Sequence, residues 1–251
     1  MQDNTGSLKD KVALVTGAAH RIGAEIVRSL HDQGMNVVIH YRASRKGAQA
    51  LQEELNAKRE NSVLLIQADL LQTNKITSMV MEVVQTWGRL DVVINNASTF
   101  YSTPIGSVDE TKWNDIIGSN LKAPFFLSQA AAPHLKASHG CIINIVDIHA
   151  ERPLKNYPVY SMAKAGLRML TMSMARELGP EVRVNGIAPG AILWPEHEMD
   201  QVTKQRIISR TALKRQGDPA DIARAALFLV FEADYITGQI ITVDGGRIIS
   251  G

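Results

Sequence analysis

Residues 12–23 read Val-Ala-Leu-Val-Thr-Gly-Ala-Ala-His-Arg-Ile-Gly, and this stretch decides the fold. The first four residues are an apolar run typical of a buried strand, and a turn of small residues follows. Apolar residues then recur at helical spacing, at Ile22, Ile26, Val27 and Leu30. A strand, a turn with Gly17 and Gly23, and a helix start with unpaired N–H groups predict a dinucleotide diphosphate site. On the glycines alone, a plain strand-to-helix turn stays open.

The rest of the chain repeats this alternation of strand and helix. Further strands are predicted at residues 35–40, 63–67, 91–94, 141–146, 182–187 and 239–243. Helical patterns cover residues 76–87, 113–135 and 159–178, and a last helix begins at the N-cap Asp218 and ends at Phe231. No linker, repeat or composition break divides the chain. We therefore predict an α/β fold with one domain over residues 1–251, a Rossmann-like doubly wound parallel sheet flanked by helices.

Polar and turn residues follow the predicted strands at their carboxyl ends. These residues are Gly17, Asp69, Asn95, Asp147 and the pair Pro189-Gly190. Ligands of doubly wound sheets bind beyond the carboxyl ends of the strands, so all of these residues are expected along one edge. Residues 191–210 follow the Pro189-Gly190 turn and are expected to form a substrate lid.

The second predicted strand ends in His40-Tyr41-Arg42-Ala43-Ser44-Arg45. A site that prefers NAD places an acidic residue near this point, about 20 residues beyond the glycines, to bind the ribose 2′-hydroxyl. Here two arginines and the Ser44 hydroxyl stand instead, which suits a 2′-phosphate. The segment predicts NADPH/NADP as the cofactor, with solvated surface arginines as the alternative.

Tyr160 and Lys164 are spaced at i and i+4 in a predicted helix. This spacing brings both side chains to one face, where the ammonium is expected to lower the phenol pKa and prepare it for proton transfer. Taken alone, such a pair is also ordinary helix surface. Together with the dinucleotide signals it predicts hydride transfer coupled to protonation.

Composition restricts the possible partners. The 251 residues carry a net charge of +2, so neither nucleic acid nor an anionic membrane surface is expected as a partner. No apolar run is long enough to span a bilayer, and the single Cys141 is expected to be a buried structural thiol in a cytoplasmic protein. Glu196, His197 and Glu198 are adjacent and cannot easily converge on one ion, so no metal is expected.

These motifs together resemble the short-chain dehydrogenase/reductase family over nearly the whole chain. The matching elements are Thr16-Gly17 with Gly23, Asp69, Asn95-Asn96-Ala97, Asn120, Tyr160 with Lys164, Pro189-Gly190 and Asp244-Gly245-Gly246. The resemblance implies that Tyr160 is the acid, that Lys164 binds the nicotinamide ribose and that Asn120 holds a water in a proton relay. It also implies a homotetramer. The implied cofactor-binding residues are Gly17, Arg21, Ile22, Gly23, His40, Tyr41, Arg42, Ser44, Asp69, Leu70, Asn95, Ala97, Ser98, Lys164, Pro189 and Gly190.

Two departures from the general family pattern narrow the resemblance. Arg21 occupies the place of a middle glycine, and Asp147 replaces the serine that precedes the catalytic tyrosine. Both features, and the segment from Asn95 to Pro104, are similar to pteridine reductases. That resemblance implies that Phe100 stacks on a pterin, that Ser98 hydrogen-bonds to it and that Arg21 reaches substrate and diphosphate. The implied substrate-binding residues are Arg21, Ser98, Phe100, Asp147, Tyr160 and Trp194, the last of which either touches substrate or anchors the lid.

The serine-to-aspartate replacement suits the chemistry of a C=N bond. A ketone needs only polarisation of its oxygen, whereas a pterin needs a proton delivered to a ring nitrogen, which a carboxyl beside the tyrosine can assist. The alternative for Asp147 is a helix N-cap or loop residue. The leading hypothesis is therefore an NADPH-dependent pteridine reductase that acts on dihydropterins such as dihydrobiopterin or dihydromonapterin, with dihydrofolate left open as a further substrate. A short-chain carbonyl reductase acting on 3-oxoacyl or other ketones and a catalytically idle NADPH-binding sensor stay open.

Overall fold

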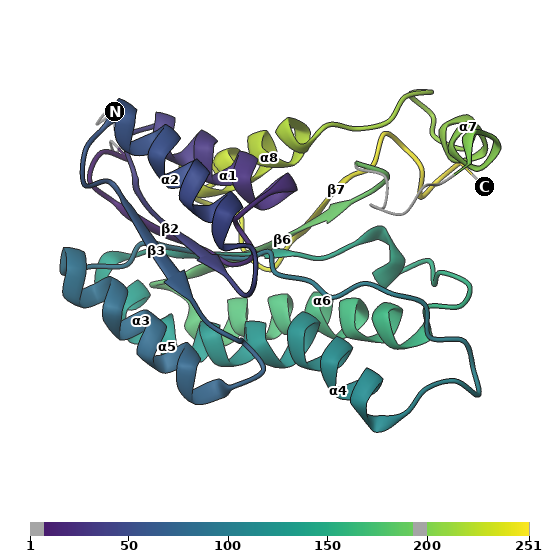
Figure 1. Ribbon diagram of the computed structural model, residues 1–251, viewed down its shortest axis with the longest axis horizontal. Helices are drawn as coiled ribbons and strands as arrows, with labels where there is room; N and C mark the ends of the chain where they lie inside the picture. The colour runs from purple at the N-terminus through teal and green to yellow at the C-terminus, as the bar shows by residue number, and fades with distance from the viewer. Residues whose placement is uncertain (1–7, 193–199, 251) are drawn as a thin grey trace.

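In the computed structural model, which describes residues 8–192 and 200–250, seven parallel strands form one sheet in the order β3-β2-β1-β4-β5-β6-β7 (Figure 1). The strands are β1 Val12–Val15, β2 Asn36–Tyr41, β3 Val63–Gln67, β4 Val92–Asn95, β5 Cys141–Ile145, β6 Arg183–Pro189 and β7 Ile240–Val243. Each lies within one or two residues of its predicted place. The order reverses direction between β1 and β4, as in a doubly wound sheet, so the predicted α/β fold is confirmed.

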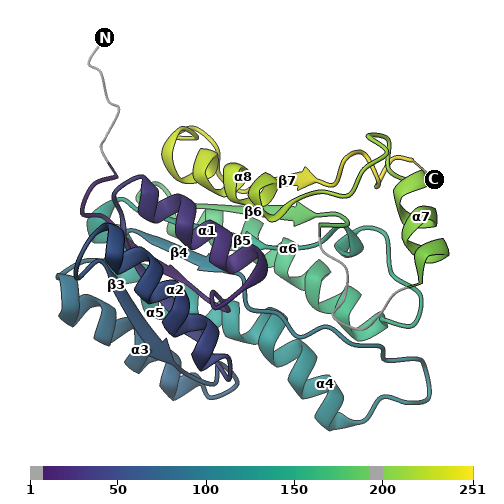
Figure 2. The same cartoon turned by 45° about the horizontal axis from the view of Figure 1, so that its top comes forward.

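Helices cover both faces of the sheet (Figures 1 and 2). One face carries α1 Arg21–Asp32, α2 Arg45–Lys58 and α8 Pro219–Phe231, and the other carries α3 Thr73–Trp87, α5 Ala123–Ser138 and α6 Pro158–Leu178. α4 Glu110–Ile117 and α7 Gln201–Ser209 lie towards one end of the molecule. Of the described helices, none is both long and apolar enough to cross a membrane.

The two faces have separate hydrophobic cores because side chains alternate along each strand. In β1, Ala13 and Val15 pack into the core under α1 and α8, whereas Val12 and Leu14 pack into the core under α3 and α5. All four are completely buried. This burial on both faces explains why the strand is a continuous apolar run rather than an alternating one.

The predicted helix over residues 113–135 is helical throughout, but its pitch changes along its length. The α-helices α4 and α5 are joined without a break by a π-helical segment, Gly118–Lys122. A Cβ at Gly118 would lie 2.4 Å from a Leu71 methyl group, so a larger residue here would require the Leu71 side chain to move. Asp109 caps α4 by accepting a hydrogen bond from the Lys112 N–H. The apolar pattern alone did not indicate the change of helical pitch.

The amino end of β1 is held by a buried carboxylate. Asp91 accepts a 2.8 Å hydrogen bond from the Val12 N–H, and its two oxygens accept hydrogen bonds from Nε and Nη2 of Arg89. The Asp91 side chain is 4% exposed and that of Arg89 is 45% exposed. The free-energy cost of desolvation therefore falls mainly on the Asp91 carboxylate, and its hydrogen bonds with Val12 and Arg89 offset that cost.

We expect Asp91→Ala to lower the free energy of unfolding by about 2–3 kcal/mol, because Val12 and Arg89 both lose a charged acceptor. Urea denaturation followed by circular dichroism measures the change. Arg89→Ala is the control and should cost less than about 1 kcal/mol, because its side chain is exposed and the Val12 bond survives. Equal losses in the two variants would contradict this account of Asp91.

Candidate active site

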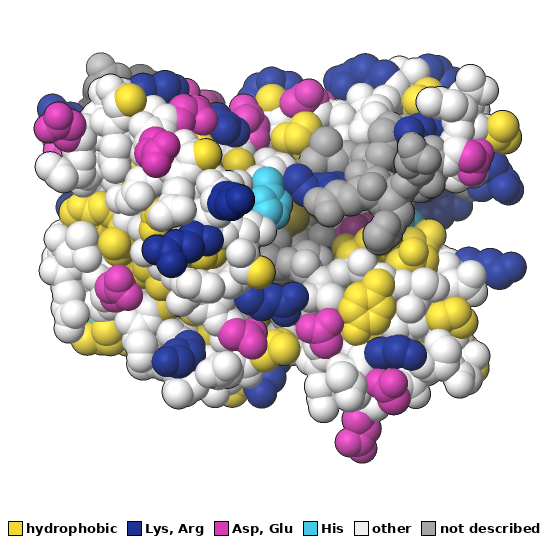
Figure 3. Space-filling model, in the orientation of Figure 1, with side chains coloured by type: hydrophobic (Ala, Val, Ile, Leu, Met, Phe, Trp, Pro, Cys, Tyr) yellow, Lys and Arg dark blue, Asp and Glu magenta, His cyan; other side chains and the backbone are white. Residues whose placement is uncertain are grey.

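A cleft of about 680 Å³ runs along the carboxyl ends of the strands. Most of the residues expected to bind cofactor or substrate line it. These are Gly17, Arg21, Ile22, Gly23, His40, Tyr41, Arg42, Ser44, Asp69, Leu70, Ala97, Ser98, Phe100, Asp147, Tyr160, Lys164, Pro189 and Gly190. On the face drawn in Figure 3, Lys and Arg side chains lie around a histidine near the middle of the molecule.

The turn after β1 lies against the chain that follows β4. Gly17 has a φ of +61°, and a Cβ there would lie 2.9 Å from the Ala97 Cα. The Thr16 hydroxyl accepts hydrogen bonds from the N–H groups of Asn96 and Ala97, each at 3.0 Å. A Cβ at Gly23 would lie 2.6 Å from the Gly17 carbonyl oxygen. Both glycines are therefore required by close backbone packing, which leaves the start of α1 open to a diphosphate.

Arg21 begins α1 in a left-handed conformation, with a φ of +58°. A non-glycine residue in this region costs on the order of 1 kcal/mol. The Arg21 side chain is exposed and forms part of the cleft wall. A strained arginine facing a cleft favours a functional role for its side chain.

His40 lies buried at the end of β2, on the floor of the cleft. Its Nδ1 is 3.2 Å from the Gly17 amide nitrogen, and its Nε2 is 3.1 Å from the Ala68 carbonyl oxygen. Only the neutral tautomer with a proton on Nε2 makes both bonds. Burial lowers the pKa of His40 to about 4, against smaller opposing effects of the Ala68 carbonyl and Asp69. The imidazole is therefore neutral over the physiological range.

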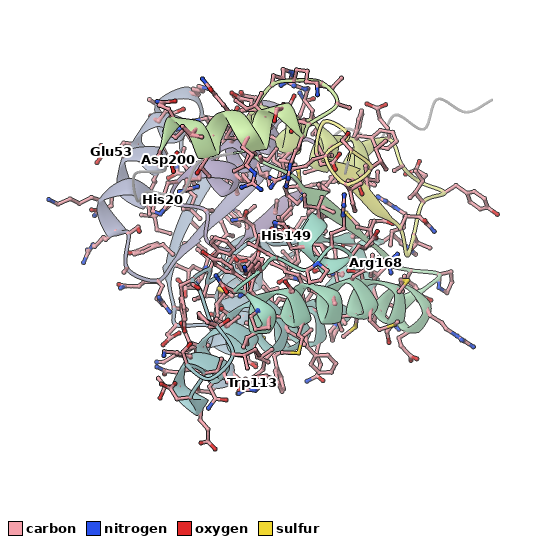
Figure 4. All side chains as sticks on the ribbon, turned by 90° about the vertical axis from the view of Figure 1, so that its right-hand side faces the viewer. His20, Glu53, Trp113, His149, Arg168 and Asp200 are labelled. Atoms are coloured by element: carbon pink, nitrogen blue, oxygen red, sulfur yellow. The ribbon has the colours of Figure 1, made fainter. Side chains whose placement is uncertain are left out.

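The expected 2′-phosphate residues lie at the rim of the cleft. Arg42 is 59% exposed, and its Nη1 is 3.7 Å from Asp115 Oδ1 of α4. Ser44 is the N-cap residue of α2, and its Oγ is 3.4 Å from Nε2 of His20. His20 also lines the cleft and was missed in the sequence. In Figure 4 it lies on the side of α2, whereas His149 lies near the centre of that view.

Tyr160 and Asp147 are in direct contact. The Tyr160 hydroxyl donates a 2.8 Å hydrogen bond to Asp147 Oδ2, and Asp147 Oδ1 accepts one from the His149 N–H at the same distance. Burial and the Asp147 carboxylate raise the pKa of Tyr160 well above its ordinary value, and a hydrogen bond with Ser98 lowers it slightly. Asp147 is therefore both a cap residue and a neighbour of the tyrosine. One of its oxygens caps the turn Ile148–Ala150, and the other accepts the hydrogen bond from Tyr160.

The expected lowering of the tyrosine pKa by Lys164 is wrong for this structure. The Lys164 Nζ is 5.6 Å from the Tyr160 ring centroid and donates a 2.9 Å hydrogen bond to the Ile145 carbonyl. Burial lowers the pKa of Lys164 to about 8, against the opposing effect of Asp147. Desolvation of the phenol and the nearby carboxylate therefore outweigh the ammonium.

An aromatic group stands beside these residues. The Phe100 ring stacks on Tyr157 with centroids 4.6 Å apart and an interplanar angle of 12°. It also meets Tyr160 edge-on, with centroids 4.8 Å apart. Phe100 is 45% exposed, so one part of this large apolar ring is available to a flat ligand. Tyr157 was missed, although its i, i+3 spacing from Tyr160 at a helix start was a usable signal.

Asn95 and Asn120 are both buried and do not line the cleft, and the water relay expected of Asn120 stays a prediction. Asn95 is buried inside the fold, where its amide donates a 2.8 Å hydrogen bond to Asn144, and its neighbour Asn96 lines the cleft instead. Asn120 is also fully buried, and its amide donates to the carbonyls of Thr99 and Ile116. The Asn120 oxygen accepts a 2.7 Å bond from Ser98. Its side chain thus orients Ser98 and does not reach the cleft itself.

Arg247 is a further charged residue near Asp147 that the sequence analysis missed. It lies half-buried in the turn after β7, and burial lowers its pKa while Asp147 and Asp244 raise it. Trp194 and the triplet Glu196, His197 and Glu198 lie outside the described residues.

The expected lid over residues 191–210 is described only in part. Ile192 lines the cleft, and α7 begins after its cap Asp200, whose carboxylate accepts a hydrogen bond from the Thr203 N–H. Cys141 is buried, as expected, and burial raises the pKa of its thiol to about 11. A thiol in this state is a poor nucleophile.

Comparison with known proteins places this cleft in a family context. A family model described as enoyl-(acyl carrier protein) reductase matches residues 17–247. Pteridine reductase 1 of Leishmania tarentolae is 34% identical, over 94% of this chain and 95% of that protein. The 3-oxoacyl-[acyl-carrier-protein] reductase FabG of Staphylococcus aureus is 37% identical, over 94% of this chain and 97% of that protein. An uncharacterized oxidoreductase of Methylorubrum extorquens is 34% identical over 95% of this chain.

The buried histidine predicts a pH-dependent stability. Between pH 6.5 and 4 the unfolded chain binds a proton at His40 and the folded chain does not, so the free energy of unfolding falls as the pH falls. A shift of this size corresponds to a loss of about 3 kcal/mol across that window and no further loss below it. Urea denaturation of the wild type and of His40→Asn at several pH values isolates this contribution. A constant stability difference between the two proteins from pH 7 to 4 would contradict it.

Proposed function

Because this chain belongs to the short-chain dehydrogenase/reductase family of NAD(P)-dependent reductases, we propose that it transfers hydride from NADPH to a dihydropterin. The observation that carries the proposal is the 2.8 Å contact between Tyr160 and Asp147 beside the exposed ring of Phe100. A carboxylate in contact with the acid is suited to protonation of a ring nitrogen, and an exposed aromatic ring is suited to a flat heterocycle. The similarity to pteridine reductase 1 supports the same reading.

The residues of the cleft fit a phosphorylated dinucleotide. The absence of a Cβ at Gly17 and Gly23 lets the turn pack tightly against Ala97 and Asn96. A bound diphosphate would then lie at the start of α1, whose first N–H groups have no partner within the helix. Arg42 and Ser44 would bind the 2′-phosphate, and Lys164 would bind the nicotinamide ribose. When bound, NADPH supplies a hydride to the carbon of the substrate C=N bond.

The chain's own residues supply the proton that the ring nitrogen needs. Tyr160 keeps its proton at neutral pH because its pKa is raised, so it can act as the donor. Asp147 is half-buried, holds the tyrosine hydroxyl and can return a proton from solvent after the transfer. Ser98, fixed by Asn120, would orient the pterin at the same place.

A carbonyl reductase is the second candidate, and the 37% identity to FabG favours it. A ketone substrate would use Tyr160 as the acid and would have no need of a carboxylate at position 147. Oxidation of NADPH by the purified protein in the presence of dihydrobiopterin or a β-keto ester separates the two candidates. Oxidation with neither compound would support the idle NADPH-binding sensor.

We also propose a homotetramer. Several large apolar side chains on α5 and α6 are exposed in the single chain, among them Phe125, Met162 and Met169. Burial of such side chains between subunits would contribute favourably to association.

For cofactor preference, we expect Arg42→Ala to reduce kcat/KM for NADPH by roughly tenfold or more, because a charge-assisted contact to phosphate contributes about 1.5–3 kcal/mol. The value for NADH should change little, since that cofactor lacks the 2′-phosphate. Steady-state kinetics with both cofactors test this, and Arg224→Ala, which removes an exposed arginine that pairs with Asp221 on α8, gives a control of equal charge change. A parallel loss with NADPH and NADH would refute the 2′-phosphate role.

For substrate class, we expect Asp147→Ser to keep NADPH binding but to lose dihydropterin turnover by a factor on the order of 10². Activity on a reactive ketone should persist or rise, because serine restores the residue of ketone-reducing relatives. Kinetics with dihydrobiopterin and a ketone measure both, with Tyr160→Phe as the control that should lose activity on each. Unchanged pterin turnover in Asp147→Ser would sink the pteridine proposal.

A further inference from the structure

The side chain of His40 connects the ends of three neighbouring strands. The side chain extends from β2. Its Nδ1 accepts a hydrogen bond from the Gly17 N–H in the turn after β1, and its Nε2 donates one to the Ala68 carbonyl just beyond β3. The His40 backbone carbonyl also accepts the Ala18 N–H, at 2.9 Å. The first two N–H groups of the glycine turn are therefore both bound to this one residue.

We propose that His40 is a positioning residue for the dinucleotide, which fixes the glycine turn through the Gly17 N–H so that the start of α1 faces the diphosphate. This inference rests on the proposed function, because it assumes that NADPH binds along this turn. It assigns His40 no contact with the reacting atoms.

The turn is held on its other side by different residues. The Asn96 side chain donates hydrogen bonds to the carbonyls of Thr16 and Gly17, at 2.7 and 3.1 Å. The Thr16 hydroxyl in turn accepts a hydrogen bond from the Asn96 backbone N–H, just beyond β4. These bonds fix the carbonyl groups of the turn, whereas His40 fixes its N–H groups. These hydrogen bonds hold the turn, in which Gly17 has a positive φ, in one conformation before the cofactor binds. The entropy cost of ordering its flexible glycines is therefore not subtracted from the binding free energy.

The bond also decides which N–H groups are available to the cofactor. The Gly17 and Ala18 N–H groups point at His40, so the donors left for a diphosphate are those of the first turn of α1, which have no partner within the helix. His40 therefore acts on the cofactor through the backbone of the turn.

A pair of variants separates the two bonds of the imidazole. In His40→Asn the side-chain oxygen can take the position of Nδ1 and still accept the Gly17 N–H, but it cannot reach Ala68. In His40→Gln the side-chain nitrogen can take the position of Nε2 and keep the Ala68 bond, but the Gly17 acceptor is lost. If His40 positions the turn, only the glutamine variant loses cofactor affinity.

Three measurements on the full-length protein test the proposal. Amide hydrogen exchange at Gly17, measured without cofactor, should be slow in the wild type and in His40→Asn and at least tenfold faster in His40→Gln. The dissociation constant of NADPH, from tryptophan fluorescence, should rise roughly tenfold in His40→Gln and less than threefold in His40→Asn. At saturating NADPH, kcat of His40→Gln should stay within about twofold of wild type, so the effect appears in KM.

The outcomes discriminate between this inference and the proposed function. Thermal unfolding of both variants reports their general stability. If His40→Gln and His40→Asn lose stability equally and bind NADPH equally, His40 is a structural residue only and the inference is overturned. If wild-type protein shows slow exchange at Gly17 but binds no NADPH, the proposed function fails while the holding of the turn stands. Fast exchange at Gly17 in the wild type would refute the inference directly.

Discussion

The close approach of the turn after β1 to the chain after β4 is the constraint on which the cleft depends. At Gly17 there is no room for a side chain, because Ala97 lies against it, and Thr16 and Asn96 join the two segments by hydrogen bonds. The strand order reverses between β1 and β4, which is where ligands bind in doubly wound sheets. These hydrogen bonds therefore fix the bottom of the cleft at that point. The side chains of the cleft then project from strand ends whose relative positions are fixed.

Burial governs the electrostatics of the centre of the cleft. Lys164 is withdrawn from solvent and is hydrogen-bonded to a backbone carbonyl, while Asp147 keeps contact with solvent and accepts the Tyr160 hydroxyl. Desolvation penalises the charged forms of both the phenol and the ammonium, so it raises one pKa and lowers the other. The Tyr160 phenol therefore keeps its proton at neutral pH, and its hydroxyl is hydrogen-bonded to a carboxylate that is only half-buried.

The fold could be predicted from the sequence because apolar runs such as Val12–Val15 are buried on both faces and recur with helical segments between them. Much of the cleft followed from one rule, that ligands lie at the carboxyl ends of parallel strands. The rule does not say which face a side chain takes, which is why Asn95 was misplaced and Asn96 overlooked. His20 lines the cleft and Tyr157 stacks on Phe100, and both are helix N-cap residues that the apolar periodicity of a helix does not include. The sign of the tyrosine pKa shift depended on depth of burial, which spacing along a helix cannot give.

The π-helical segment between α4 and α5 makes this region sensitive to a change in length. Successive residues of an α-helix are rotated by about 100°, and a π-helical turn accommodates a residue more than an α-helical one. Deletion of one residue from Gly118–Lys122 would therefore convert the wide turn into a regular α-helical turn and keep α4 and α5 roughly in register, but it would change the directions of the side chains within the turn itself. Asn120 would turn away from Ser98, which it now orients. Insertions and deletions here should be rarer among functional sequences than in the exposed loop before α4, because Gly118, Ser119 and Asn120 are buried.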